Sequence, residues 1–168
     1  MLNATLFTVI LSQRPQNIRS RASNESFDNP PSLVSEFVSP KGFYKLTYDQ
    51  RQWTVNQSDS GVIFVLNKDY GLARLDIVEG ETEKDITSLT DEILKDLPLA
   101  PVTIKADEFN GKPSYTLTYK EQVLGIDTYY YKKIVKNGNK FFIFIKRAPQ
   151  LGYDQPFVDN LLQNISFI

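Results

Sequence analysis

The sequence predicts an α+β domain, an antiparallel β-sheet flanked by helices. Apolar and polar residues alternate over much of the chain, as in strands with one buried face. Asparagine-glycine pairs at 110–111 and 137–138 mark tight turns, which join antiparallel neighbours. Apolar residues recur at helical spacing within 86–97 and 157–165. Hairpin-linked strands grouped around few helices favour an antiparallel sheet with the helices on it.

The composition limits the possible functions. A length of 168 residues suits one domain, and 41% hydrophobic content is typical of a folded protein. A net charge of -1 gives no overall field that favours nucleic acid or an anionic membrane. Cysteine and histidine are both absent, which excludes disulfides, zinc sites of those residues and histidine-dependent triads within this chain. We therefore expect no metal and no cofactor.

The first 36 residues differ from the rest, and we place the single domain at 37–168. The stretch 4–11 is apolar but far shorter than the roughly 20 residues of a membrane-spanning helix. It is either a loosely docked terminus or the remnant of a signal or anchor helix, with arginines after it on the side that the positive-inside rule makes cytoplasmic. Residues 20–32 are polar, end in two prolines and are expected to form a linker.

The domain begins with a strand that a polar turn interrupts. Tyr44, Leu46 and Tyr48 alternate with polar residues, and the tetrapeptide "DQRQ" follows. Trp53 then resumes the two-residue period. This pattern predicts that the Trp53 ring is a buried structural element and not a ligand platform on a loop.

Next come a hairpin and a helix. A loop at 68–71 sets Phe64 opposite Leu75 and Val62 opposite Ile77. The helix at 86–97 takes Thr82 or Asp85 as its cap and Pro98 as its stop. The acidic residues before it suit the positive end of the helix dipole, whereas a calcium loop would need the alternating ligands and central glycine that are missing here. These residues are Glu79, Glu81, Glu83 and Asp85.

Two longer hairpins complete the sheet. The turn at 110–111 pairs Ile104 with Leu117 and leaves the opposite face polar, so we expect one wet face. The turn at 137–138 is expected to pair Ile134 with Phe141. Both faces of this second hairpin are then largely apolar, as in a central hairpin covered on both sides. A closing helix with Asp154 as cap, running through Ile165, is expected to pack on the sheet.

The stretch "GFYKLTYDQRQWTV" at 42–55 resembles the opening signature of PsbP-like domains. Gly42, Phe43, Tyr48 and Trp53 match that signature, while Asp49 stands where the family usually has proline. The likeness continues in the acidic segment, both long hairpins and the C-terminal stretch. It implies an α/β/α sandwich around an antiparallel sheet and a protein that binds and does not catalyse.

Proteins of this fold, as the resemblance implies, have diverse roles. They include extrinsic lumenal subunits of photosystem II, a Ran-binding nucleotide-release factor, exported bacterial proteins, and chaperones for the hydrophobic helices of secreted effectors. Fold alone does not choose among these roles. The chain has no lipobox cysteine, and the lack of histidine weakens any transfer of a metal-binding photosystem role.

Our first functional hypothesis is a non-catalytic, extracytoplasmic binding or assembly module. It is associated with a membrane through a truncated N-terminal anchor, and its partner is another protein, with the domain itself monomeric. The alternative is a chaperone-like protein that holds apolar helices of a partner on an open sheet face. The candidate binding residues for that face are Tyr131, Phe142 and Phe144.

Two further functions are weaker hypotheses. The first is a hydrolase that uses Asp76 and Glu79, because paired carboxylates do acid-base work when their environments separate their pKa values. Nucleic-acid binding would use basic residues interleaved with aromatics, but lysines beside a hairpin turn also keep exposed strand edges soluble. We expect no nucleic-acid partner. The basic residues are Lys132, Lys133, Lys136, Lys140, Lys146 and Arg147.

Overall fold

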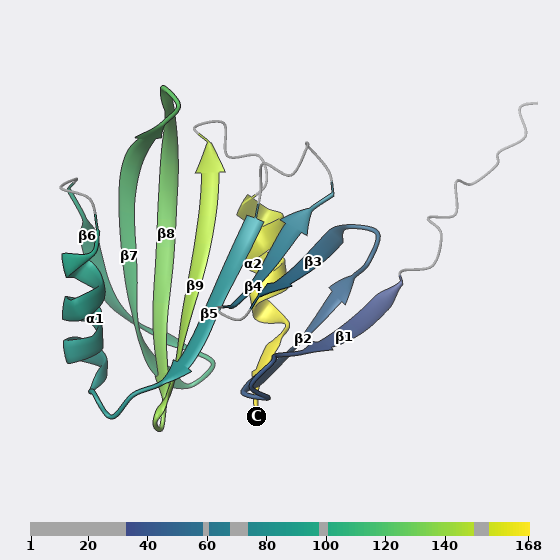
Figure 1. Cartoon of the computed structure of the whole chain (residues 1–168), viewed down its shortest axis with the longest axis horizontal. Helices are drawn as coiled ribbons and strands as arrows, with labels where there is room; N and C mark the ends of the chain where they lie inside the picture. The colour runs from purple at the N-terminus through teal and green to yellow at the C-terminus, as the bar shows by residue number, and fades with distance from the viewer. Residues whose placement is uncertain (1–32, 59–60, 68–73, 98–100, 150–154) are drawn as a thin grey trace, which may run out of the picture. The chain divides into compact units, whose positions relative to one another are not determined.

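The computed structural model describes residues 33–58, 61–67, 74–97, 101–149 and 155–168, all within one compact unit that spans Pro31–Ile168. It contains two antiparallel sheets and two short helices (Figure 1). Almost all of the expected tail, the loop at 68–71 and the expected cap Asp154 lie outside the described residues. Among the helices that are described, none has the length and apolar character needed to cross a membrane.

The larger sheet has seven strands, and each strand is antiparallel to its neighbours, which confirms the predicted antiparallel sheet. Its strands from one edge to the other are β3 (Trp53–Ser58), β4 (Gly61–Leu66), β5 (Arg74–Glu81), β9 (Lys140–Pro149), β8 (Ile126–Asn137), β7 (Lys112–Val123) and β6 (Thr103–Phe109). The predicted pairing of β4 with β5 is also confirmed, with Phe64 opposite Leu75.

A smaller sheet of three strands was not predicted. It consists of β1 (Val34–Val38), β2 (Tyr44–Asp49) and β10 (Ile165–Phe167), with β2 in the middle. Ile165 lies opposite Leu46. The expectation that Ile165 belongs to the closing helix is therefore wrong, since α2 (Gln155–Gln163) ends before it and the chain turns into a strand.

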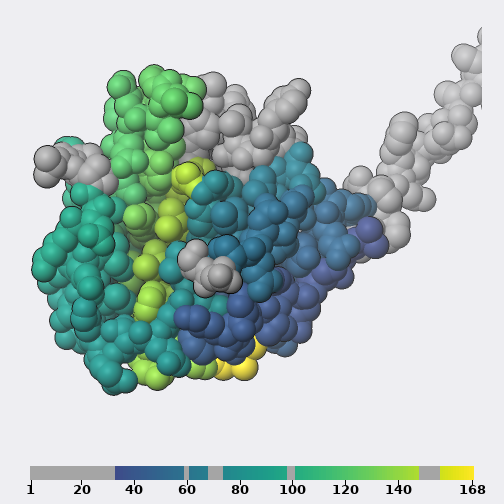
Figure 2. Space-filling model, viewed as in Figure 1, coloured from purple at the N-terminus to yellow at the C-terminus, as the bar shows by residue number. Residues whose placement is uncertain are grey.

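The two faces of the larger sheet carry separate apolar clusters. One face joins the main core, in which Phe64, Phe142 and Phe144 are buried together with residues of α2 and the smaller sheet. The opposite face packs against α1 (Ile86–Lys95) through Leu117 and Ile134. Atoms of β9, yellow-green in Figure 2, remain visible beside α1, so this helix covers only part of its face.

The layers are therefore one helix, the larger sheet, and a mixed layer of one helix and the smaller sheet. Successive side chains along each strand point to opposite faces, so alternate residues of the larger sheet contact the two outer layers. The description that holds is an antiparallel sheet with two short helices. The α/β/α sandwich in its plain form omits the smaller sheet.

Helix α1 begins where the sequence predicts. The Asp85 carboxylate is the N-cap and accepts a hydrogen bond of 2.8 Å from the backbone N–H of Ser88. That hydrogen bond, the largest cause, holds the pKa of Asp85 below its ordinary value. The preceding acids do not gather into one cluster, because Glu79 is buried in β5 while Glu81 and Glu83 are exposed. The described residues contain no group of acidic side chains suited to a metal ion.

The hairpin of β6 and β7 has the predicted turn and register. Asn110 and Gly111 have φ values of 50° and 72°, as a type I′ turn requires. The expected wet face, however, is wrong on β7, where Ser114 and Thr116 are buried. The reason is position in the sheet: β7 has a neighbour on each side, and Lys133 of β8 lies opposite Thr116. The predicted face is wet on the edge strand β6 and at Thr118, where the pairing of β7 with β6 ends.

The hairpin of β8 and β9 forms at the predicted turn with a different register. Asn137 pairs with Lys140, so the central turn residues are Gly138, with a φ of 63°, and Asn139. Ile134 consequently lies opposite Ile143 and not opposite Phe141. A change of partner by two residues leaves every side chain on its expected face, because the strand period is two. The prediction that both faces are largely apolar is confirmed, and their cover is more complete on the main-core face than on the face of α1.

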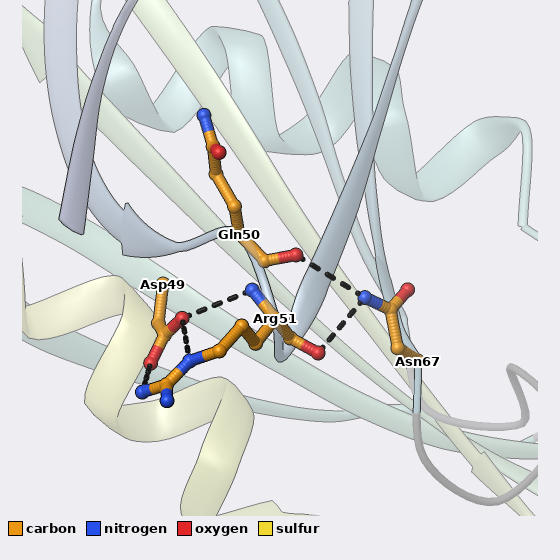
Figure 3. A network of polar contacts seen from close by, with 4 residues as sticks. All are labelled: Asp49, Gln50, Arg51 and Asn67. Atoms are coloured by element: carbon orange, nitrogen blue, oxygen red, sulfur yellow. Dashed lines mark hydrogen bonds and ion pairs between the residues drawn. The ribbon is translucent and has the colours of Figure 1, made fainter. Parts of the chain in front are cut away.

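The turn before Trp53 is held by a compact polar network (Figure 3). The Asp49 carboxylate accepts hydrogen bonds from the backbone N–H and the guanidinium of Arg51, and the Asn67 amide donates to the carbonyl oxygens of Gln50 and Arg51. Hydrogen bonds from the Arg51 side chain lower the pKa of Asp49. The turn returns the chain into the fold with Trp53 only 4% exposed in the main core, which confirms its predicted structural role.

The Tyr44 hydroxyl provides a first test of the main core. Tyr44 is fully buried, and within the described residues its hydroxyl has no hydrogen-bond partner. Burial, followed by the nearby Glu79 carboxylate, raises the pKa of Tyr44. Tyr44→Phe removes a desolvated hydroxyl at little change in shape, so we expect the free energy of unfolding to stay equal or to rise by up to about 1 kcal/mol. Urea denaturation of both proteins measures this, and a clear loss of stability would show that the hydroxyl has a partner.

Candidate functional site

The two phenylalanines of the predicted binding face lie inside the protein. Phe142 and Phe144 are both 0% exposed, with rings stacked at a centroid distance of 6.3 Å in the main core. Neither ring therefore offers a surface to a partner in this structure. The expectation of an open face built on them overlooked α2 and the smaller sheet, which cover this side of β9.

Tyr131, the third predicted residue, is partly exposed and lines a cavity of about 410 Å³. We call this cavity the tyrosine cleft. It lies near the end of the β7–β8 hairpin, and its lining is Pro101, Thr118, Tyr119, Lys120, Tyr129, Tyr130 and Tyr131. Sequence analysis identified only Tyr131 of these, although the run of three tyrosines at 129–131 was a signal that this strand carries an aromatic surface.

Tyr131 is held by polar neighbours on the strands beside it. The Lys146 ammonium lies 3.9 Å from the centroid of the Tyr131 ring, close enough for a cation–π interaction. The Tyr131 hydroxyl lies 3.5 Å from the Thr116 hydroxyl, a long hydrogen bond. Lys146 is itself buried and donates to the Asp159 carboxylate of α2 at 2.5 Å. Tyr131 therefore has a defined position between β7 and β9.

A second buried lysine continues this polar strip along the sheet. Lys133 is 7% exposed, and its ammonium donates a hydrogen bond of 2.7 Å to the Asp107 carboxylate of β6. The Lys133 ammonium also lies 5.5 Å from the centroid of the Phe109 ring. Both buried lysines thus have a carboxylate partner and an aromatic neighbour, which is how a desolvated cation is accommodated. The two ammonium groups are therefore neutralised by carboxylates of the protein itself.

Two stacked tyrosines form another part of the cleft lining. The rings of Tyr119 and Tyr130 are parallel within 2° at a centroid distance of 5.0 Å. Burial, with smaller contributions from Glu121 and Tyr130, raises the pKa of Tyr119 to about 12. Burial and the same Glu121 carboxylate also raise the pKa of Tyr130. Both hydroxyls are therefore protonated at neutral pH.

These properties decide what the cleft is able to do. A tyrosine that acts as a general base or nucleophile needs a lowered pKa, the opposite of the shifts at Tyr119 and Tyr130. Protonated hydroxyls donate hydrogen bonds, and the rings supply rigid apolar area at a small cost in conformational entropy. The cleft thus suits recognition of a ligand that has apolar groups and hydrogen-bond acceptors.

The carboxylates of the hydrolase hypothesis do not converge. Asp76 and Glu79 are three residues apart on β5, and an odd separation places them on opposite faces of the sheet. The Asp76 carboxylate accepts hydrogen bonds of 2.7 Å from Arg74 and 2.9 Å from Arg147, whereas Glu79 accepts one of 3.2 Å from the backbone N–H of Lys41. The structure contradicts this pair as a catalytic dyad.

The basic residues of the nucleic-acid hypothesis are also divided between the two faces. Lys133 and Lys146 lie on the main-core face, and Lys132 and Arg147 lie on the opposite face. They do not make one positive stripe along the hairpin.

A second cavity, of about 290 Å³, lies where α2 meets the turn before β3. Trp53 is one of its lining residues, together with Tyr48 and Phe157. With 4% of its surface exposed, Trp53 contributes to the floor of this cavity and offers no open platform.

Comparison with known proteins places the fold. No protein-family model matches the sequence, and no curated protein matches it. A crystal structure from Bacteroides thetaiotaomicron aligns with a TM-score of 0.61 at 13% identity over 79% of this chain, which spans only 48% of that protein. The solution structure of cyanobacterial PsbP (CyanoP) from Synechocystis aligns with a TM-score of 0.60 at 14% identity, covering 84% of this chain and 96% of CyanoP.

A third solved structure, the Pseudomonas aeruginosa protein of unknown function PA94, aligns with a TM-score of 0.50 at 15% identity, covering 77% of this chain and 94% of PA94. The chain therefore has a PsbP-like fold, as the resemblance of residues 42–55 implied. At these identities the likeness concerns the fold, and function depends on the residues of this chain.

Proposed function

We propose that this protein is a non-catalytic binding module that recognises another protein through the tyrosine cleft. The observation that carries the proposal is the lining of the cleft. It combines a partly exposed Tyr131 in a fixed position on one face of the sheet with Tyr119 and Tyr130 on the other face, whose raised pKa values keep them as hydrogen-bond donors. Tyrosine-rich, pre-organised surfaces are favourable for protein recognition because little side-chain entropy is lost on binding.

We further propose that the module acts outside the cytoplasm and is associated with a membrane through its N-terminal region. Support for this comes from the sequence, namely the apolar stretch 4–11, the arginines after it and the polar linker before the domain. The resemblance to PsbP-like domains, which include extrinsic lumenal subunits, points in the same direction. The partner segment expected at the cleft carries apolar side chains next to free carbonyl or carboxylate acceptors.

A cross-linking experiment in the source organism tests the proposal. A photoreactive amino acid replaces Tyr129, which lines the cleft and is 47% exposed, in the full chain. We expect a discrete protein adduct in the extracytoplasmic or membrane fraction. The matched control carries the same photoreactive residue at Glu92, which is exposed on α1. Equal adducts at both positions would contradict binding through the tyrosine cleft. A chain found only in the cytoplasm would contradict the proposed location.

The role of Tyr131 gives a quantitative prediction. Tyr131→Ala removes one of the aromatic rings that line the cleft, so the affinity for the cross-linked partner is expected to fall about tenfold or more. Tyr131→Phe keeps the ring over Lys146 and removes only the hydroxyl, so a smaller loss is expected. Titration calorimetry with the purified partner measures both. Equal affinities of Tyr131→Ala and the parent protein would exclude the cleft as the binding site, and binding of unrelated apolar helical peptides instead would favour the chaperone alternative.

A further inference from the structure

The end of the β7–β8 hairpin extends beyond the rest of the larger sheet. Pairing of β7 with β6 reaches only to Thr118, and pairing of β8 with β9 reaches only to Thr128. Each strand lacks its outer neighbour beyond these points, and the residues at 122–123 and 126–127 pair only with each other, ending at Val123 opposite Ile126. The green end of this hairpin projects from the surface at the top of Figure 2.

The tip of this two-stranded extension, Val123–Ile126, is apolar and exposed. Leu124 is 97% exposed, Ile126 is 57% exposed and Val123 is 41% exposed. A soluble hairpin normally carries polar residues at such a turn. Three aliphatic side chains within four residues, in water at the turn of a projecting hairpin, indicate a contact with an apolar environment.

The backbone conformation of the tip is a second, independent observation that Leu124 is unfavourable at this turn. Leu124 and Gly125 have φ values of 53° and 79°, so both central residues of the turn are in the left-handed region. Asn-Gly is the favoured pair for such a turn, and a branched apolar residue at the first position is strained. The same protein uses Asn-Gly at 110–111, with φ values of 50° and 72°. Leu124 is thus unfavourable for the turn itself and unfavourable in water, which points to a role outside folding.

The residues next to the tip are of the types found where a protein meets the headgroup region of a membrane. Tyr129 is 47% exposed, and the Lys120 ammonium donates a hydrogen bond of 2.8 Å to the Asp127 carboxylate. Tyrosine is enriched at the boundary between hydrocarbon and headgroups, and lysine reaches from there toward water. The Lys120–Asp127 pair and Glu121 leave no excess of positive charge next to the tip, so attraction to anionic lipid is not the driving force.

We propose that the tip Val123–Ile126 inserts into the interface of a lipid bilayer, as a membrane contact separate from the N-terminal region. A bilayer suits this tip better than a protein pocket because a convex, purely aliphatic end needs no matching shape in fluid lipid. So few aliphatic side chains give only weak and reversible binding, which serves to orient a domain that is already near the membrane. In that orientation, the residues that line the tyrosine cleft on the same hairpin lie close to the membrane surface.

A fluorescent label close to the tip tests the proposal in the full chain. The protein has no cysteine, so Gln122→Cys allows one environment-sensitive dye to be attached at an exposed position beside the tip. With phosphatidylcholine vesicles we expect a rise in fluorescence that quenchers in the acyl chains reverse. Phosphatidylglycerol in the vesicles and high salt are expected to change it little. The control label at Lys105→Cys, exposed on β6, is expected to stay in water.

Leu124→Asn in the labelled Gln122→Cys protein separates membrane contact from folding. The substitution creates an Asn-Gly turn, so the thermal unfolding midpoint is expected to be equal or higher. The partition coefficient of the tip into vesicles is expected to fall about tenfold, because the largest aliphatic side chain is lost. Dye fluorescence at position 122 that vesicles leave unchanged would overturn the proposal. This holds even when the N-terminal region binds the chain to the vesicles. A partition coefficient that Leu124→Asn leaves unchanged would overturn it too. The exposed aliphatic tip would then be explained by insertion into a pocket of a partner protein.

Discussion

Replacement of Trp53 by alanine is expected to lower the free energy of unfolding by about 3–5 kcal/mol. Trp53 is 4% exposed in the main core and is the first residue of β3, directly after the turn that Asp49, Arg51 and Asn67 hold. Its removal leaves a cavity where the two sheets and α2 meet. Because the substitution removes the only tryptophan, guanidinium unfolding followed by far-UV circular dichroism is the suitable measurement.

Two comparison variants separate the cavity from other effects. Trp53→Phe keeps most of the ring and is expected to lose about 1–3 kcal/mol. Tyr129→Ala removes an aromatic ring that is 47% exposed, so its effect on stability is expected to stay near about 0.5 kcal/mol. A Trp53→Ala protein as stable as Tyr129→Ala would show that Trp53 is not part of the folded core.

Phe144→Ala is expected to have an effect of similar size, again about 3–5 kcal/mol of lost stability. Phe144 is fully buried, and its ring centroid lies 5.3 Å from that of Phe109 and 6.3 Å from that of Phe142. Truncation removes these contacts in the centre of β9, where the surrounding strands restrict relaxation. Urea denaturation monitored by Trp53 fluorescence measures the loss.

The same variant tests the chaperone hypothesis. Phe144→Leu retains much of the volume and is expected to cost less than about 1.5 kcal/mol. Ile104→Ala, at a residue that is 48% exposed on β6, provides the exposed control and is expected to change stability by less than about 1 kcal/mol. If Phe144→Ala left stability unchanged and abolished binding of apolar helical peptides, Phe144 would be a surface residue, contrary to the structure.

Local sequence signals predicted much of the larger sheet. The β4–β5 pairing and the hairpin at Asn110–Gly111 have the expected registers, because loop length and turn type fix which residues face each other. At Asn137–Gly138 the turn uses Gly138 and Asn139, and the register differs by two residues. The sequence "NGN" accommodates a two-residue turn in either position, so the local signal does not distinguish them.

Features that depend on distant parts of the chain escaped prediction. β10 forms because Ile165 pairs with Leu46, a residue that is distant in the sequence. This pairing outweighs the local helical spacing of apolar residues, which extends through Ile165. The burial of Phe142 and Phe144 likewise depends on α2 and the smaller sheet. Of the proposed binding residues, Tyr131 lines one of the two described cavities, together with Pro101 from the segment before β6. Alternation assigns a residue to a face but does not tell what covers that face.

The pairing of β10 with β2 also has a consequence for the time course of folding. Residues 165–167 lie far along the sequence from the strand Tyr44–Asp49, yet they complete the sheet to which that strand belongs. Contacts between such distant residues are slow to form, because a long loop must close before they stabilise anything. The larger sheet contains no strand from residues 165–167, so its strand pairing does not depend on them. The smaller sheet is thus complete only after residues 165–167 have been synthesised and have reached β2.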